Sequence, residues 1–226
     1  MTPAILKRLA QILFLVLLQV IVLFFSAWKW DWWNAWVYLG LYMVFLVFNA
    51  SILLRKHKEL VEERAHIGEG TKGWDKIIGG IGAFGGLLIL ALAGLDERFS
   101  WPGTIRLEVQ IAAFILLAVT YPIFTWAMVS NRYFATTVRI QKERGHTVQT
   151  GGPYRFVRHP GYFSVLCSYV TAPFALGSLW ACIPAALLII NMVVRTALED
   201  RVLQNELEGY KEYAARVNFK LIPGIW

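Results

Sequence analysis

Ionisable side chains gather in two short segments, each of which borders a long apolar stretch. The first is "GGPYRFVRHPGYF" (Gly151–Phe163), which combines two arginines and a histidine with two prolines. The second is "RTALED" (Arg195–Asp200), in which Arg195 and Glu199 are four residues apart and would share one face of a helix. If the apolar stretches span a bilayer, ionisable groups at its edge are costly unless they are paired or hydrated. Both segments therefore mark a candidate site.

The first segment has the composition of a rigid connector. Pro160 prevents a helix from running through the segment, and Gly151, Gly152 and Pro153 predict a turn at its start. We therefore expect residues 154–159 to form a short connector at the membrane surface.

Each feature alone also has an ordinary structural interpretation. Arg155 and Arg158 could be anchors that extend from a membrane edge toward water. Arg195 and Glu199 could form a helix-surface salt bridge, which contributes only about 0.3–0.5 kcal/mol. Only the joint pattern of the two segments favours a site.

The composition indicates which elements must position these residues. Of the 226 residues, 57% are hydrophobic and 16% are charged, which is too apolar for an ordinary soluble domain. Four runs have about the twenty residues that a spanning helix needs: Leu9–Ala27, Ala35–Leu54, Ile77–Leu95 and Leu107–Val129. A fifth region, Tyr162–Val194, is too long for one helix and contains the possible breakers Pro173, Gly177 and Pro184.

The distribution of Lys and Arg predicts how these spans are threaded. The N-terminus, the loop after the second run, the segment after the fourth run and the C-terminal tail are all basic, so they are expected on the cytoplasmic side. An even number of crossings must then follow Arg158, which makes the fifth region a hairpin. The sequence predicts an all-α, multi-pass membrane bundle of about six helices, with both termini, a connector and a C-terminal helix on the cytoplasmic side.

We expect a four-span region at residues 1–130 and a region carrying the site at residues 131–226. The net charge of +7 is interpreted as orientation and contact with anionic lipid, and no nucleic-acid partner is expected. Cys167 and Cys182 both fall in the hairpin, so neither a disulfide nor a metal site is expected.

Three stretches together form an ordered motif: "VRIQKERGHTVQTGGPYRFVRHPGY" (Val138–Tyr162), "RTALED", and "ELEGYKEYAARVNFKLIPGIW" at the end of the chain. This motif resembles the isoprenylcysteine carboxyl methyltransferase family, which groups with the membrane phospholipid methyltransferases. The resemblance covers roughly residues 130–226. The first four spans are similar only in being hydrophobic.

The resemblance implies S-adenosylmethionine as the methyl donor. Its contacts would fall on Gln141, His146, Thr147, Val148, Gln149, Tyr154, Arg158, His159, Pro160, Gly161, Tyr162, Glu199 and Asp200, where Asp200 replaces a Glu that is common in the family. Arg195, facing the acceptor, and Glu199 would be the catalytic pair. These roles suit the chemistry, because a sulfonium cation is stabilised by aromatic faces and by a carboxylate.

Several other chemistries lack their residues in this sequence. There is no glycine-rich strand-turn-helix for a soluble Rossmann-type methyltransferase, and no Ser/His/Asp set. Methyl transfer needs mainly alignment and exclusion of water. The acceptor would enter from the bilayer and the donor from the cytoplasm, and a prenylated cysteine, a phospholipid amine and a small thiol all stay possible as acceptors.

Two other functions fit the sequence. An NADPH-dependent membrane enzyme of the sterol-reductase type has a similar tail, and the surplus arginines could bind the 2′-phosphate. A non-catalytic membrane protein on the same scaffold would bind no cofactor.

Overall fold

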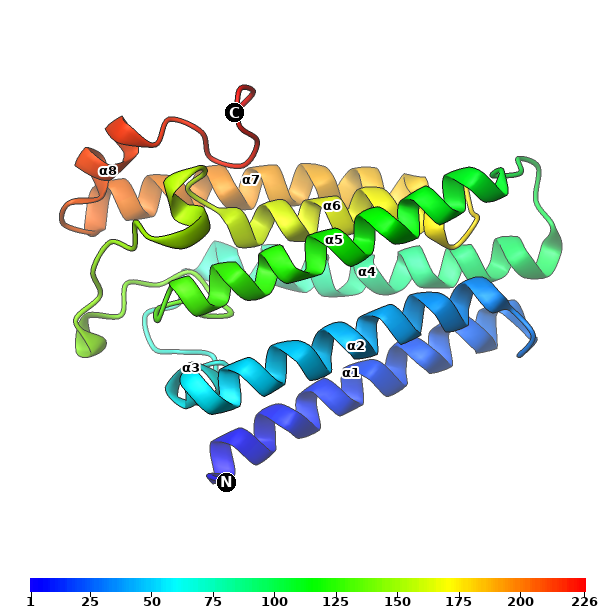
Figure 1. The fold of residues 1–226 in the computed structure, drawn as a ribbon, viewed down its shortest axis with the longest axis horizontal. Coiled ribbons are helices and arrows are strands. Elements are labelled where there is room, and N and C mark those ends of the chain that lie inside the picture. The colour runs from blue at the N-terminus through cyan, green and yellow to red at the C-terminus, as the bar shows by residue number, and fades with distance from the viewer.

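The computed structural model describes all of residues 1–226, and the molecule is built from helices (Figure 1). The α-helices are α1 (Pro3–Ala27), α2 (Trp33–Lys56), α3 (Lys58–Glu63), α4 (Gly73–Phe99), α5 (Leu107–Ser130), α6 (Pro160–Ala175), α7 (Cys182–Glu206) and α8 (Tyr210–Arg216). Two 3-10 turns, η1 (Lys142–Arg144) and η2 (Gly152–Arg155), lie in the connector between α5 and α6. The predicted all-α fold is confirmed.

Five helices are long and apolar enough to cross a membrane: α1, α2, α4, α5 and α7. They have 24 to 27 residues each, and at about 1.5 Å per residue each exceeds the roughly 30 Å thickness of a hydrocarbon core. The first four contain the four predicted runs. The chain is therefore a multi-pass integral membrane protein.

The fifth apolar region forms the predicted hairpin. Gly177 has a φ of +79°, a conformation that glycine adopts without strain, and it turns the chain between α6 and α7. Ser178 in this turn pairs with Thr104 in the connection between α4 and α5. The turn therefore lies at the end of the bundle opposite the connector, and the hairpin crosses the bundle.

The hairpin differs from the prediction in two respects. Helix α6 has only 16 residues, or about 24 Å, so it is shorter than a full span. Neither Pro173 nor Pro184 ends a helix, because Pro173 lies inside α6 and Pro184 lies in the first turn of α7, where a missing N–H costs nothing. Of the three predicted breakers, only Gly177 lies in the turn between α6 and α7.

The main core lies where α1, α2, α4, α6 and α7 meet. Helix α4 approaches its neighbours closely at two glycines. A side chain at Gly94 would collide with Ser26 of α1, and one at Gly85 would collide with Leu188 of α7. The close contact at Gly85 holds α4 against α7, and α7 carries one of the two segments of the candidate site.

The non-helical segments gather at one end of the bundle. The connector, α3, α8 and the N-terminus all lie at the end where α5 and α7 finish (Figure 1). Both segments with predicted chemistry, Gly151–Phe163 and Arg195–Asp200, are thereby brought to the same end.

Candidate active site

A pocket opens between the connector, the start of α6, the end of α7 and α8. Most of the predicted cofactor contacts line it: His146, Thr147, Val148, Gln149, Tyr154, Arg158, His159, Gly161, Tyr162 and Glu199. Gln141, Pro160, Arg195 and Asp200 do not line it. We call this cavity the donor pocket, after the methyl donor whose contacts the family resemblance predicts there.

Tyr162 lies at the centre of the polar contacts in the donor pocket. Its hydroxyl donates a hydrogen bond to Oε2 of Glu199, and both side chains line the pocket. The ring stacks on His159, with centroids 5.7 Å apart and planes inclined by 5°. The Arg195 guanidinium carbon lies 5.0 Å from the centroid of the Tyr162 ring. Tyr162 thus connects the connector motif with the α7 motif.

Asp200 is buried behind the pocket, where it contacts three of the lining side chains. It accepts hydrogen bonds from Nε and Nη2 of Arg158 at 2.7 and 2.9 Å and from the hydroxyl of Tyr210 at 3.0 Å. His159 Nε2 lies 3.3 Å from the same carboxylate. Because Asp200 is 1% exposed, its role in the structure is to neutralise Arg158 and to orient Arg158 and His159.

Residues 111–205 match the isoprenylcysteine carboxyl methyltransferase (ICMT) family. This match confirms the family resemblance of the connector and α7 motifs. No curated protein matches the chain closely enough to add a named relative. Together with the membrane-spanning helices, the ICMT match supports a membrane methyltransferase.

The ICMT match starts and ends earlier than the resemblance predicted from the sequence. It begins inside α5 and ends in the last turn of α7, so it includes Tyr162, Arg195 and Glu199 but not the tail after α7. Yet Tyr210 and Tyr213 of α8 line the donor pocket as well. The pocket is therefore completed by residues outside the ICMT match.

Tyr154 forms a wall of the donor pocket with both of its polar groups occupied. Its phenol oxygen accepts a hydrogen bond from Nδ2 of Asn131 at 3.2 Å, and its carbonyl oxygen accepts one from the hydroxyl of Tyr213 at 2.6 Å. Burial raises the pKa of the Tyr154 phenol, so this side chain is neutral at any physiological pH.

His146 lines the same pocket as an uncharged imidazole. Its burial and the nearby charges of Arg139 and Arg144 lower its pKa to about 4. Its Nδ1 accepts a hydrogen bond from the backbone N–H of Gln141 at 3.3 Å. Because Nδ1 is an acceptor, the proton of the neutral ring belongs on Nε2, which is then available as a donor.

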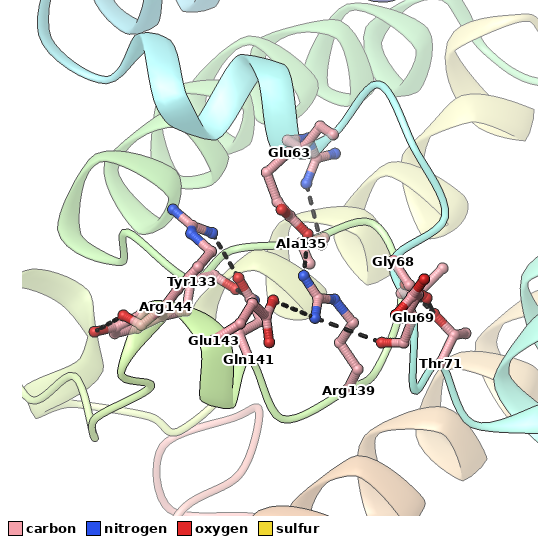
Figure 2. Close-up of polar contacts among 12 residues, drawn as sticks. Glu63, Gly68, Glu69, Thr71, Tyr133, Ala135, Arg139, Gln141, Glu143 and Arg144 are labelled. Atoms are coloured by element: carbon pink, nitrogen blue, oxygen red, sulfur yellow. Dashed lines mark hydrogen bonds and ion pairs between the residues drawn. The ribbon is translucent and has the colours of Figure 1, made fainter. Parts of the chain in front are cut away.

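Gln141 has a structural role beside the pocket. Its amide nitrogen donates to the carbonyl of Tyr133 at 2.7 Å, and its amide oxygen accepts from Arg144, contacts that Figure 2 shows together. With the side chain 1% exposed, the predicted contact of Gln141 with the cofactor would have to replace one of these bonds.

Figure 2 also shows two ion pairs of Arg139, one that holds the connector against α3 and one within the connector. Arg139 donates from Nη2 to Glu63 at 2.6 Å and from Nη1 to Glu143 at 2.7 Å. Arg139 is one of the two arginines that line the donor pocket, and Arg158 is the other. Both are therefore already paired with carboxylates.

Arg195 is held by a residue that the sequence analysis did not single out. Asp75, in the first turn of α4, accepts hydrogen bonds from Nε and Nη2 of Arg195 at 2.8 and 3.3 Å. The same carboxylate accepts from the backbone N–H of Val138 at 2.8 Å, and Arg195 also donates to the carbonyl of Thr136 at 3.1 Å. Asp75 thus ties α4, the connector and α7 together beside the donor pocket.

Two aromatic residues that lie just ahead of the connector motif and line the pocket were also missed by sequence reasoning, as were Tyr210 and Tyr213 of α8. The Tyr133 ring packs against His146 with centroids 4.4 Å apart and planes inclined by 32°, and Phe134 lies beside Gly161. The available signal was their position, an aromatic pair directly after a predicted span and before the connector motif. Asp75 gave no such signal, because its partners Val138 and Arg195 are 63 and 120 positions away in the sequence.

Proposed function

We propose that this protein is an S-adenosylmethionine-dependent methyltransferase of the membrane that binds its donor in the donor pocket. The observation that carries the proposal is the Tyr162–Glu199 pair, which lies in the ICMT-matching region and presents an aromatic ring and a carboxylate to one cavity. A sulfonium cation needs these two kinds of group.

The other lining residues fit the remainder of such a donor. Tyr133, Tyr154 and Tyr213 supply aromatic surface for an adenine ring, and neutral His146 has a free N–H for a polar atom of the nucleoside or amino acid part. When bound, S-adenosylmethionine supplies an electrophilic methyl group, whose transfer needs an aligned nucleophile. The protein's contribution is then to orient both reactants and exclude water.

The catalytic pair Arg195 and Glu199 stays a prediction with distinct roles for its members. We propose that Glu199 offsets the donor's positive charge and that Arg195 acts near the acceptor. Arg195 contacts Tyr162 but is bound by Asp75, so an acceptor carboxylate would have to share the guanidinium with that residue.

We also propose that the donor pocket faces the cytoplasm. The connector that forms the pocket, between α5 and α6, is rich in Lys and Arg. Short basic loops stay on the cytoplasmic side. Soluble donor would then reach the pocket directly from the cell interior.

An NADPH-dependent function has less support. A 2′-phosphate needs arginines without a carboxylate partner, but Arg139 and Arg158 both have one.

Calorimetric titration of the purified protein in nanodiscs tests the proposal directly. We expect S-adenosylmethionine and S-adenosylhomocysteine to bind and NADPH not to bind. Labelled S-adenosylmethionine with a lipid extract would then reveal the acceptor as a labelled lipid. Binding of NADPH without S-adenosylmethionine would contradict the proposal in favour of a reductase, and binding of neither would contradict it in favour of a non-catalytic protein.

A further inference from the structure

A second cavity lies between the end of α7 and the tail that follows α8, which folds back toward α7 (Figure 1). We call this cavity the tail hollow. Only one of its seven lining residues, Ala197, is apolar. It shares Arg158 with the donor pocket, and no other residue lines both cavities. The tail hollow is therefore a polar site of its own.

The tail hollow has more cations than carboxylates. Arg158, Arg201 and Lys220 line it, and Asp200 is the only acidic residue among its walls. The Asp200 carboxylate is already occupied, because it pairs with Arg158 and accepts a hydrogen bond from Nε2 of Gln204 at 2.8 Å. Unlike Arg158, Arg201 and Lys220 form no salt bridge. Two cations of the hollow therefore lack a counter-charge within the protein.

The hollow continues the lipid-facing side of α7. Ile190, Val194, Ala197 and Arg201 follow one another at steps of three or four residues, so they share one face of the helix. Ile190 and Val194 are 60% and 45% exposed, as side chains in contact with lipid would be. Arg201 lies 19 residues after Cys182, the first residue of α7, or about 28 Å along the axis. Because a hydrocarbon core is roughly 30 Å thick, we expect Arg201 at the level of the lipid headgroups.

The tail presents Lys220 among residues that suit a membrane surface. Nζ of Lys220 lies 4.3 Å from the centroid of the Trp226 ring, a contact that positions the ammonium group without neutralising it. The neighbouring Ile225 is 77% exposed. Lysine beside tryptophan is typical of the interface between membrane and water. Both walls of the hollow thus indicate a site where lipid and water meet.

We propose that the tail hollow binds the phosphate of an anionic phospholipid from the leaflet at the connector end of the bundle, with Arg201 and Lys220 as its ligands. A guanidinium donates paired hydrogen bonds to phosphate oxygens, and a lysine ammonium adds a point charge. The acyl chains would lie along Ile190 and Val194. A zwitterionic headgroup fits less well, because its own cation would find only the occupied carboxylate of Asp200. A soluble phosphate would leave the apolar face of α7 unused.

A phosphate bound to both cations would fasten the tail to α7. The carbonyl of Lys220 accepts a hydrogen bond from the backbone N–H of His159 at 2.9 Å, and the carbonyl of Phe219 accepts one from the backbone N–H of Arg158, also at 2.9 Å. The same short segment of the tail thus binds the connector and carries the lipid ligand. An anionic lipid would thereby stabilise the connector together with the tail.

Native mass spectrometry of the full chain in a neutral detergent tests the site without relying on activity. The probes are dioleoyl phosphatidylglycerol, dioleoyl phosphatidylcholine and inorganic phosphate. We expect phosphatidylglycerol to bind more tightly than phosphatidylcholine. Arg201→Gln and Lys220→Gln should each lower the affinity for phosphatidylglycerol about fivefold, the effect of removing one cation beside an anionic lipid.

The matched controls are Arg216→Gln and Lys211→Gln. Both residues are exposed cations at the same end of the bundle, and neither lines the tail hollow. These variants should leave the affinity nearly unchanged. Ala197→Phe keeps every charge but fills the hollow from its lipid-facing side, so it should also weaken binding of phosphatidylglycerol.

Thermal unfolding of the same samples tests whether the lipid fastens the tail. Phosphatidylglycerol should raise the Tm of the wild type, and it should raise the Tm of an Arg201→Gln/Lys220→Gln double variant much less. Equal losses of affinity in the site and control variants would mean diffuse attraction to charge and would overturn the proposal. Equal binding of the two lipids would overturn it as well. An equal rise in Tm with inorganic phosphate would contradict a lipid ligand in favour of a soluble anion.

Discussion

At the scale of single residues, Glu199 is the side chain whose role is easiest to isolate. It lines the donor pocket and its only hydrogen-bonding partner is the hydroxyl of Tyr162. Glu199→Gln keeps the size of the side chain but removes the negative charge, so we expect donor affinity to fall by about tenfold to hundredfold, the effect of losing a charged contact. Isothermal titration with S-adenosylmethionine measures this change.

The matched comparison is Arg195→Gln. Arg195 is bound to Asp75 outside the donor pocket, so donor affinity should change little while the acceptor KM rises or kcat falls. Equal loss of donor affinity in both variants would contradict this division of roles.

Asp200 should be important for stability. Replacing it with Asn leaves Arg158 buried without a counter-charge, which costs on the order of 3–5 kcal/mol. Glu206→Gln is the control, because Glu206 forms an exposed salt bridge with Lys72, and such pairs contribute about 0–1 kcal/mol. Thermal unfolding in detergent compares the two, and a similar small loss in both would mean that the Asp200 network adds no stability.

His146 should make folding depend on pH. Its pKa is lowered from 6.5 to about 4 in the folded protein, so between these values the unfolded chain binds more protons. The stability that neutral His146 contributes is complete above about pH 6.5 and is lost as the pH falls toward about 4. We expect the Tm of the wild type to fall more steeply over this window than that of His146→Gln. The exposed His66→Gln serves as control, and parallel curves for wild type and His146→Gln would contradict the prediction.

The residues of the site were partly predictable from the sequence, and the reason is local. Tyr154, His159 and Tyr162 belong to one short motif whose Gly and Pro residues fix its shape, so their common location could be expected. Whether the amide of Gln141 faces the pocket depends on the fold of η1 next to it. Asp75 joins Arg195 across 120 positions of sequence, a contact that no local pattern encodes.

At the scale of elements, the connector depends on the C-terminal tail. The backbone N–H groups of Arg158 and His159 donate to the carbonyls of Phe219 and Lys220, both at 2.9 Å, and the Arg158 side chain donates to the carbonyl of Val217 at 2.7 Å. The tail therefore binds the connector at Arg158 and His159, two residues that line the donor pocket.

Truncation after Arg216 should weaken both stability and donor binding. Each lost hydrogen bond contributes about 1 kcal/mol, and the freed connector would have to be ordered again on binding. Truncation after Pro223 keeps the residues that bind the connector and should have a much smaller effect. Melting curves with and without S-adenosylmethionine report both quantities. If the two truncations behave alike, the tail does not support the pocket.

At the scale of the whole molecule, the lengths of the apolar runs and the positions of the basic segments were sufficient to predict a helical bundle that contains a hairpin. Leu9–Ala27 became the greater part of α1, and the region too long for one helix became a hairpin. What the sequence could not give was the length of α6, because helix ends inside a continuous apolar region depend on packing. The prediction of a four-span region and a site region stays open, since α5 and α6 pack on each other across that boundary.

The predicted orientation can be tested with single cysteines at the two ends of the bundle. Leu179 lies exposed in the hairpin turn, and Glu212 lies exposed on α8 beside the donor pocket. Cys167 and Cys182 are first replaced by Ala, which removes the native thiols. A membrane-impermeant maleimide applied to intact cells should label Leu179→Cys and not Glu212→Cys, because the basic end of the bundle is expected inside. Permeabilised cells should label both, which controls for access. Labelling of Glu212→Cys from outside would place the donor pocket on the wrong side for a cytoplasmic donor, and labelling of both from outside would contradict the crossing of the hairpin.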